Sequence, residues 1–142
     1  MGIISKIKSF FNFQSIELKI ITVQNINFNS SNINGQYMIR TNVNAKILAI
    51  TFTAFAEIEE KEFVIAKSQI LAIPINLVAH TEIIENFSFE LPHLGAQMAK
   101  INILNENEAR KQNIHFRLLM AVDIEATTAL FDPTINKYFD LE

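Results

Sequence analysis

The chain is 142 residues long, with 49% hydrophobic and 19% charged residues and a formal net charge of −3. This composition supplies enough apolar side chains for a packed core and excludes a wholly disordered chain. The scattered lysines and arginines do not form the basic surface of a nucleic-acid-binding protein, so we expect no nucleic-acid partner. The sequence has no cysteine, which excludes disulfide bonds and thiol chemistry.

The chain begins with a short amphipathic segment, which we assign to residues 1–13. Five apolar residues recur there at helical spacing and form a candidate interaction surface: Ile3, Ile4, Ile7, Phe10 and Phe11. A helix this short needs a surface on which to form. Three surfaces are open to it: the protein's own domain, a partner or second copy of the chain, and a membrane interface that Lys6 and Lys8 would help it to reach.

Two-residue alternation dominates the rest of the chain, residues 14–142, which we interpret as one domain. The pattern is clearest in residues 114–124, where one face carries Ile114, Phe116, Leu118, Met120, Val122 and Ile124. Residues 46–58 form a second long strand, and one of its faces carries Leu48, Ile50, Phe52, Ala54, Ala56 and Ile58. This periodicity predicts strands that bury one side chain in two.

Shorter strands and polar turns complete the predicted fold. Strands are expected at residues 16–20, 35–43, 63–65, 87–91, 100–104 and 135–141. Turns are expected at residues 59–62 and 105–113, which are polar. About eight or nine strands with almost no helical period predict an all-β protein, an antiparallel β-sandwich.

The sequence lacks the patterns of an enzyme or a metal site, so we expect no catalytic residue, cofactor or metal. The glycines are too far apart for a phosphate-binding loop. His80, His93 and His115 lack metal-ligand spacing and are interpreted as surface or capping residues, although His80 and Glu82 would share one face of a strand. Two further groups offer no catalytic arrangement, because they lie in strands or in a solvated turn: Ser68 and Ser88, and Glu59, Glu60 and Glu62.

A mixed-charge stripe lies on the outer side of the strand at residues 114–124. It consists of His115, Arg117, Asp123 and Glu125. One interpretation is a solvated face with cross-strand ion pairs worth about 0.2–1 kcal/mol each. The other is a face that binds a partner.

No stretch of the sequence is apolar for about 18 residues, so no membrane-spanning helix is expected. The first residues also lack the continuous apolar core of a signal peptide. We therefore expect the protein in the cytoplasm.

Several short motifs resemble the arrestin-like sporulation-control proteins of bacteria. They include Ala121-Val122-Asp123-Ile124, Ala129-Leu130-Phe131-Asp132-Pro133-Thr134, Tyr138-Phe139-Asp140-Leu141 and Phe87-Ser88-Phe89-Glu90-Leu91-Pro92. The strand that opens near Gly35 and the start Lys8-Ser9-Phe10-Phe11 are similar to that family too. The resemblance extends over most of the chain and corresponds to a single arrestin-like half.

This resemblance implies an arrestin-like β-sandwich that acts as a non-catalytic protein-interaction adaptor or regulatory scaffold. The implied partners are proteins, and no catalytic residue carries over from the family. A second copy of the chain is a further expected partner, because long strands expose unpaired backbone amides at sheet edges and the N-terminal segment carries an apolar stripe. Two alternatives remain open. One is a peripheral membrane protein that uses the N-terminal segment, and the other is a β-sandwich that binds a small ligand.

Overall fold

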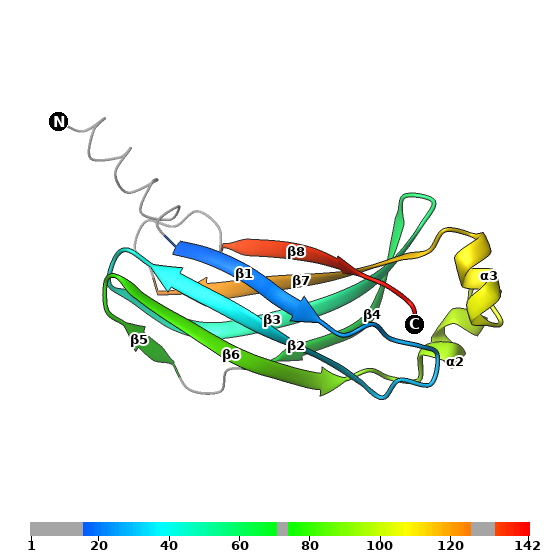
Figure 1. The fold of residues 1–142 in the computed structure, drawn as a ribbon, viewed down its shortest axis with the longest axis horizontal. Helices are drawn as coiled ribbons and strands as arrows, with labels where there is room; N and C mark the ends of the chain where they lie inside the picture. Colours follow the sequence, from blue (N-terminus) through cyan, green and yellow to red (C-terminus); the bar gives the residue numbers. More distant parts are fainter. Residues whose placement is uncertain (1–15, 71–73, 126–132) are drawn as a thin grey trace.

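A computed structural model describes residues 16–70, 74–125 and 133–142. Two antiparallel sheets face each other, and two short helices lie at one end (Figure 1). The three-stranded sheet has the order β1-β2-β6, and the five-stranded sheet has the order β4-β3-β7-β8, with β5 also paired to β3. The elements are β1 (Ile16–Val23), β2 (Asn32–Thr41), β3 (Ala45–Ile58), β4 (Lys61–Gln69), β5 (Ile75–Leu77), β6 (Thr81–Glu90), α2 (Leu94–Ala99), α3 (Glu106–Lys111), β7 (His115–Ile124) and β8 (Thr134–Phe139).

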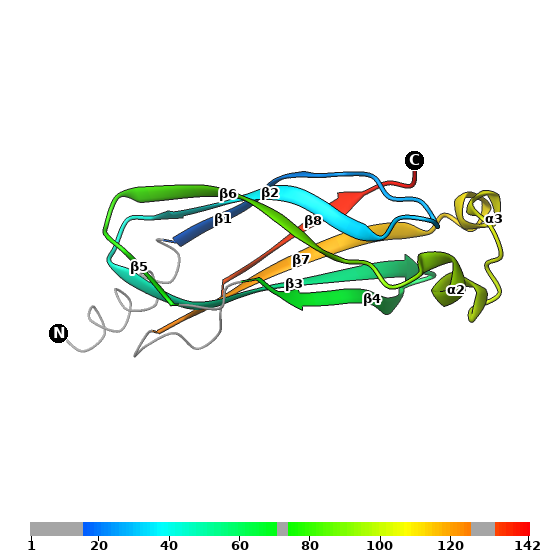
Figure 2. The same ribbon diagram turned by 90° about the horizontal axis from the view of Figure 1, so that it is seen from below.

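The predicted all-β sandwich is therefore confirmed. Figure 2 shows the two sheets as separate layers, with β8 rising toward β1 along one side. Strand β7 lies in the middle of the larger sheet, between β3 and β8. Four of its side chains point to the core and are almost inaccessible: Phe116, Leu118, Met120 and Val122. The alternation in residues 114–124 thus predicts both the strand and its buried face.

Strand β3 departs from the predicted alternation at its start. Ile47 is 1% exposed, whereas Leu48 is half-buried. The register with β7 shifts between Ile47 and Ala49, which marks a β-bulge. The extra residue turns the side chains that precede it to the opposite face of the sheet, so the assignment of Leu48 to the core face is wrong. From Ile50 onward the predicted face is correct.

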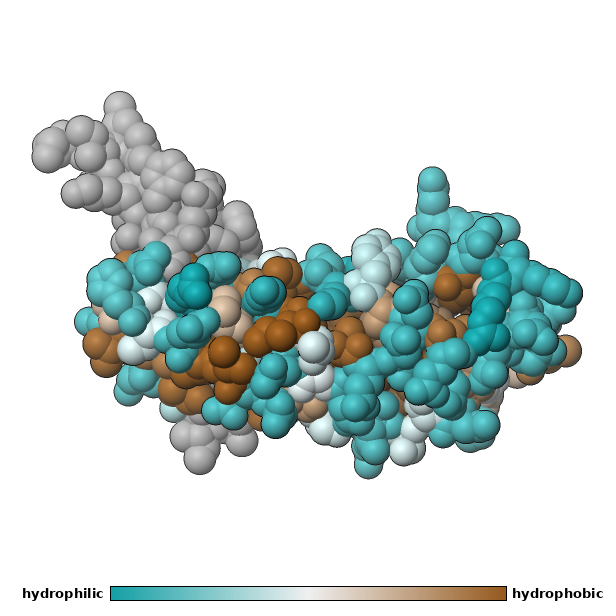
Figure 3. Space-filling model, viewed as in Figure 1, coloured by the Kyte–Doolittle hydropathy of each residue, from teal (hydrophilic) through white to brown (hydrophobic). Residues whose placement is uncertain are grey.

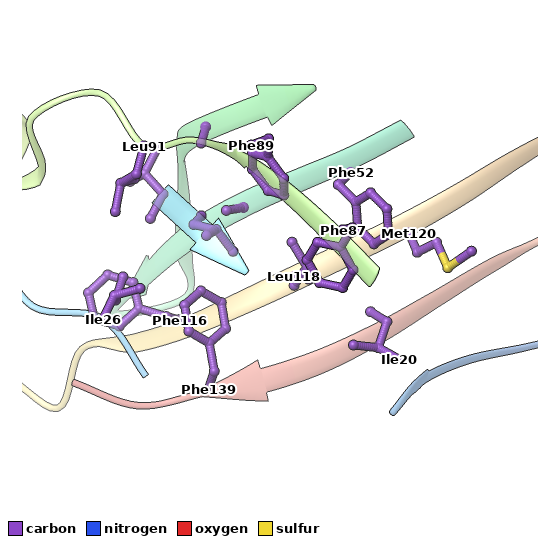
Figure 4. Packing of buried hydrophobic residues seen from close by; sticks show 14 of the residues in the cluster. Ile20, Ile26, Phe52, Phe87, Phe89, Leu91, Phe116, Leu118, Met120 and Phe139 are labelled. Atoms are coloured by element: carbon purple, nitrogen blue, oxygen red, sulfur yellow. The ribbon is translucent and has the colours of Figure 1, made fainter. Parts of the chain in front are cut away.

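Aromatic rings from both sheets fill the centre of the sandwich. Phe52 of β3 stacks on Phe87 of β6 with ring centroids 4.3 Å apart, and Phe89 lies 6.0 Å from Phe52. Tyr37 of β2 meets Phe52 edge-on at 5.9 Å. Figure 4 shows the three phenylalanine rings together with aliphatic neighbours such as Leu118. Such stacked and edge-on pairs add to the free energy gained from apolar burial.

Gly35 allows this aromatic packing. A Cβ atom at this position would lie 2.2 Å from the carbonyl oxygen of Thr22 and 2.5 Å from Cζ of Phe87. Since neither distance leaves room for a side chain, β2 needs glycine where it passes beneath the Phe87 ring.

The end of the sandwich that carries the helices contradicts two predictions. The strand predicted at residues 100–104 is wrong, because α2 ends at Ala99 and a turn follows. The polar turn predicted at residues 105–113 contains helix α3. Each helix has six residues, which is too short to display a helical period in the sequence. Side-chain caps start them: Nδ1 of His93 accepts from Ala96 N at 3.0 Å, and Oδ1 of Asn105 accepts from Glu108 N at 2.9 Å.

Some predictions fall outside the described residues. They include the interaction surface of Ile3, Ile4, Ile7, Phe10 and Phe11, and the first four residues of the motif that begins at Ala129. Among the residues that the structure describes, no helix has the length and apolar character needed to cross a membrane.

Candidate functional site

The most organised group of polar side chains lies on the outer face of the five-stranded sheet and centres on Arg117 of β7. Its Nε lies 2.7 Å from Oε1 of Glu57 on β3, and its Nη2 lies 2.6 Å from Oε1 of Glu62 on β4. Nη1 donates to the side-chain oxygen of Asn136 on β8. One guanidinium thus connects four neighbouring strands. We call this set, together with Phe55 and Tyr138, the Arg117 cluster.

The register of the sheet explains how the Arg117 cluster forms. Phe55 is directly opposite Arg117 on β3, and Tyr138 is directly opposite it on β8. The guanidinium carbon lies 4.5 Å from the centroid of the Phe55 ring, which is a cation–π contact. Because side chains alternate along a strand, Phe55 and Glu57 share the outer face and reach the same cation. The Arg117 side chain is consequently only 12% exposed.

The electrostatics of the cluster keep Arg117 charged. Burial by itself lowers the pKa of Arg117, but hydrogen bonds to and charge attraction by Glu57 and Glu62 outweigh burial and raise that pKa. The negative charge of Glu57 raises the pKa of Tyr138, whose hydroxyl donates to Oε2 of Glu57 at 3.2 Å. The arrangement is a fixed cation among satisfied partners. Arg117 is therefore unsuited to proton transfer, which needs a group that changes its protonation state.

The outer face of the three-stranded sheet carries a looser polar group. Arg40 of β2 lies 3.4 Å from Glu17 of β1 and 3.3 Å from Glu82 of β6, and half of the Arg40 side chain is exposed. Beside this row Met38 is opposite Ile84, and Ile84 is 49% exposed. Figure 3 looks onto this face and shows apolar side chains gathered among polar ones.

The histidines lie apart from one another, as the interpretation of surface or capping residues requires. His93 caps α2, and the ring of His115 lies edge-on to Tyr138 at 6.4 Å. His80 occupies a turn with φ of 65°, before β6 begins at Thr81. It therefore does not share a strand face with Glu82, and that part of the prediction is wrong. Within the described ranges, no group of three His, Asp or Glu residues is placed to hold a metal ion.

The serines and two of the three glutamates lie where the patterns predict, whereas the placement of Glu62 in the solvated turn is wrong, because β4 begins at Lys61. Ser68 is on β4 and Ser88 is on β6. Glu59 and Glu60 form the tight β3–β4 turn, both with positive φ, whereas Glu62 already belongs to β4 and binds Arg117. Within the described chain these residues therefore lie in four separate places and form no common site.

The mixed-charge stripe of β7 makes the cross-strand ion pairs that one interpretation predicted, but it is not uniformly solvated, because the Arg117 side chain is only 12% exposed. Arg117 binds Glu57 and Glu62, and Glu125 lies 3.2 Å from Lys46 of β3. The alternation of residues 46–58 places Phe55 and Glu57 on the outer face, but nothing local indicates that β7 would lie beside them.

The fold is similar to that of a sporulation control protein whose structure has been solved. Spo0M, a sporulation control protein from Bacillus subtilis, is similar with a TM-score of 0.57 and 12% sequence identity. The match covers 90% of this chain and 49% of the Spo0M chain. The chain has the arrestin-like fold. It spans about half the length of Spo0M, so it corresponds to one arrestin-like half, as the sequence motifs implied.

Weaker similarities extend to proteins from other organisms. A protein from Archaeoglobus fulgidus has a TM-score of 0.48 and 11% identity, over 90% of this chain and 96% of its own. The Arabidopsis thaliana protein AT1g01470 has a TM-score of 0.49 and 15% identity, over 88% of this chain and 81% of its own. No protein-family model and no curated protein matches the sequence.

Proposed function

We propose that this protein is a non-catalytic interaction module, an adaptor or regulatory scaffold of the cytoplasm that binds other proteins through its outer surface. The observation that carries the proposal is the fold that it shares with one half of Spo0M, a sporulation control protein. In the proposed role, the protein regulates other proteins by binding them and not by catalysing a reaction.

Two features of the molecule support protein binding over catalysis or the binding of a small ligand. Phe52, Phe87 and Phe89 occupy the space between the sheets, where a β-sandwich would otherwise hold a small ligand. In the Arg117 cluster, each carboxylate is engaged by the same guanidinium. A nucleophile or general base needs an open position beside it, whereas a recognition surface needs groups held in one geometry.

Capture of the partner tests the proposal. The tagged full chain is used as bait in an extract of its source cells, and each captured protein is purified and titrated against the chain by calorimetry. A Phe52→Asp bait is the control, since a charge in the core unfolds the domain and reveals proteins that bind any unfolded chain. We expect a partner that binds the native bait alone, with saturable binding. If every captured protein also binds the Phe52→Asp bait, the adaptor role is wrong.

We also propose that the N-terminal stripe of Ile3, Ile4, Ile7, Phe10 and Phe11 mediates self-association. Light scattering on the intact chain and on a chain without residues 1–13 tests this. The mass of the intact chain should rise with concentration, whereas the shortened chain should stay monomeric. Two strict monomers would contradict self-association through this stripe.

A further inference from the structure

The edges of the two sheets are protected to different degrees. An edge strand offers unpaired backbone groups to any other chain, and proteins protect such edges with bulges, lysines, short strands or covering segments. Strand β1 has a bulge between Ile20 and Thr22. In addition, Nζ of Lys137 on β8 donates to the carbonyl oxygens of Ile20 and Ile21, at 3.3 and 2.9 Å. The side of the sandwich formed by β1 and β8 is therefore closed.

The opposite edge of the five-stranded sheet is protected as well. The pairing of β4 with β3 skips one residue of β4 between Ala66 and Val64, and β4 carries Lys61 and Lys67. Strand β5, which continues this edge, is three residues long. These are the usual devices against pairing with another strand.

Strand β6 has none of these devices. All ten of its residues pair with β2 in one uninterrupted register, from Asn32 opposite Glu90 to Thr41 opposite Thr81. The strand contains no proline, lysine or arginine. Among the residues that the structure describes, β2 is its strand neighbour and its other edge has none. It is a long edge without a bulge.

The direction of the backbone groups on β6 follows from its first hydrogen bond beyond the strand. Leu91 N donates to the carbonyl oxygen of Ser31 at 2.9 Å, which continues the β2–β6 ladder. Backbone groups point alternately to the two sides of a strand, so Glu90, Ser88, Asn86, Ile84 and Glu82 direct their N–H and C=O groups away from β2. These five residues form the free edge.

Negative charge is the one barrier on the β6 edge. Glu82, Glu85 and Glu90 are all exposed. Glu82 binds Arg40, whereas Glu85 and Glu90 have no ion-pair partner within the described part of the chain. Pairing two copies of β6 would align six carboxylates, which disfavours a second copy of this chain as the occupant. The same charge attracts a basic strand, and the half-exposed Ile84 offers it an apolar contact.

We propose that the β6 edge binds an extended segment of a partner protein that carries lysine or arginine among alternating β-forming residues, and that this segment adds a fourth strand to the β1-β2-β6 sheet. The proposal rests on the proposed interaction function and identifies its surface. Backbone hydrogen bonds would supply the affinity, and the carboxylates would select the charge.

A designed peptide tests the edge directly. The probe is a fluorescent ten-residue peptide of alternating valine and threonine, with lysines placed opposite Glu90 and Glu85 in an antiparallel pairing. One control replaces the lysines with glutamates, and a second N-methylates the residues whose N–H groups would face β6. Binding is measured by fluorescence anisotropy with the full chain. We expect the lysine peptide to bind saturably and the glutamate peptide to bind at least about tenfold more weakly. The methylated peptide should not bind, because it cannot form the backbone hydrogen bonds to β6.

Variants of the protein provide the matching controls. Asn86→Pro removes an N–H that faces away from β2, which an edge strand tolerates, and should abolish binding, whereas Asn86→Ala should keep it. The double variant Glu85→Lys and Glu90→Lys should prefer the glutamate peptide. Glu59→Lys with Glu60→Lys makes the same charge change in the β3–β4 turn and should behave as wild type. If Asn86→Pro does not fold, the methylated peptide still tests the ladder.

Three results would overturn the proposal. The first is equal binding of the methylated and unmethylated lysine peptides, which would indicate charge attraction without a strand. The second is the absence of saturable binding by the lysine peptide. The third is self-association that Asn86→Pro removes, since a second copy would then occupy the edge. If the captured partner still binds Asn86→Pro, the interaction function stands and the β6 assignment fails.

Discussion

Two arginines occupy comparable places on the two sheets and experience different environments. Arg117 and Arg40 each lie on an inner strand, each on an outer face, and each between two glutamates from other strands. The Arg117 side chain is 12% exposed with contacts of 2.6 and 2.7 Å, whereas the Arg40 side chain is 50% exposed with contacts of 3.3 and 3.4 Å. The charge pattern is the same, and the degree of burial differs.

The difference shows how an aromatic neighbour changes the value of an ion pair. Phe55 lies beneath Arg117 and keeps water from one side of the guanidinium, whereas the Arg40 side chain is half exposed and lies beside the exposed Ile84. Less water around a pair means weaker screening and a larger cost when one partner is lost. The outer face of the five-stranded sheet is therefore expected to be rigid, and that of the three-stranded sheet adaptable.

Removing Arg117 should have the largest effect. Arg117→Ala leaves Glu57 partly buried without its cation and should lower the free energy of unfolding by about 2–3 kcal/mol. Urea unfolding followed by circular dichroism measures it. Adding Glu57→Gln should recover part of the loss, because the uncompensated charge is then gone. A decrease in the free energy of unfolding below about 0.5 kcal/mol would mean that the ion pairs of Arg117 stabilise the protein no more than exposed ion pairs do.

Replacing Arg117 with lysine should have an intermediate effect. Lysine keeps the charge but cannot lie flat on the Phe55 ring while it donates to Glu57 and Glu62 together. Arg117→Lys should therefore destabilise the protein by about 1 kcal/mol. The same urea experiment measures it, and a stability equal to wild type would show that charge alone holds the cluster.

Removing Arg40 should have a small and salt-dependent effect. Arg40→Ala should change the free energy of unfolding by less than about 1 kcal/mol, because exposed pairs contribute little. At 1 M salt the screening length falls to about 3 Å, and the difference from wild type should disappear. The Arg117→Ala difference should persist under the same conditions. If salt removed both differences alike, burial would not be what distinguishes the two arginines.

The smallest change concerns Tyr138. The negative charge of Glu57 is the main cause that raises the pKa of this tyrosine. Glu57→Gln should therefore lower the pKa of Tyr138 toward 10, since the phenolate then meets less repulsion. Absorbance titration in a Tyr37→Phe background isolates the signal, because the chain has two tyrosines. A pKa that rises or stays constant would contradict the assigned cause.

The fold was predictable where alternation runs unbroken. Phe116 to Val122 on β7 illustrates this, because a strand with one buried face must repeat every second residue. The alternation places Leu48 on the wrong face, because a bulge depends on how two strands meet and leaves no mark in one of them. Helices α2 and α3 are not predictable in the same way, because six residues held by a cap and by tertiary packing carry no clear helical period.

The candidate site was predictable in part. The pattern of β7 places Arg117 on the outer face, and the pattern of β3 places Phe55 and Glu57 on theirs. That these residues meet depends on the β3–β7 register, a pairing of positions about 60 residues apart. The free edge of β6 was likewise not predictable, since any strand becomes an edge only by its place in a sheet.

The sequence by itself determined where most of the strands lie and which side of most of them is apolar, because the two-residue period of side chains is a local property of the backbone. Only the tertiary structure decided which strands are neighbours, that Lys137 closes the β1 edge, and that β6 has a neighbour on one side within the described residues. The physical reason is that strand pairing joins distant segments, so its outcome depends on the free energy of the whole sandwich and not on any one strand.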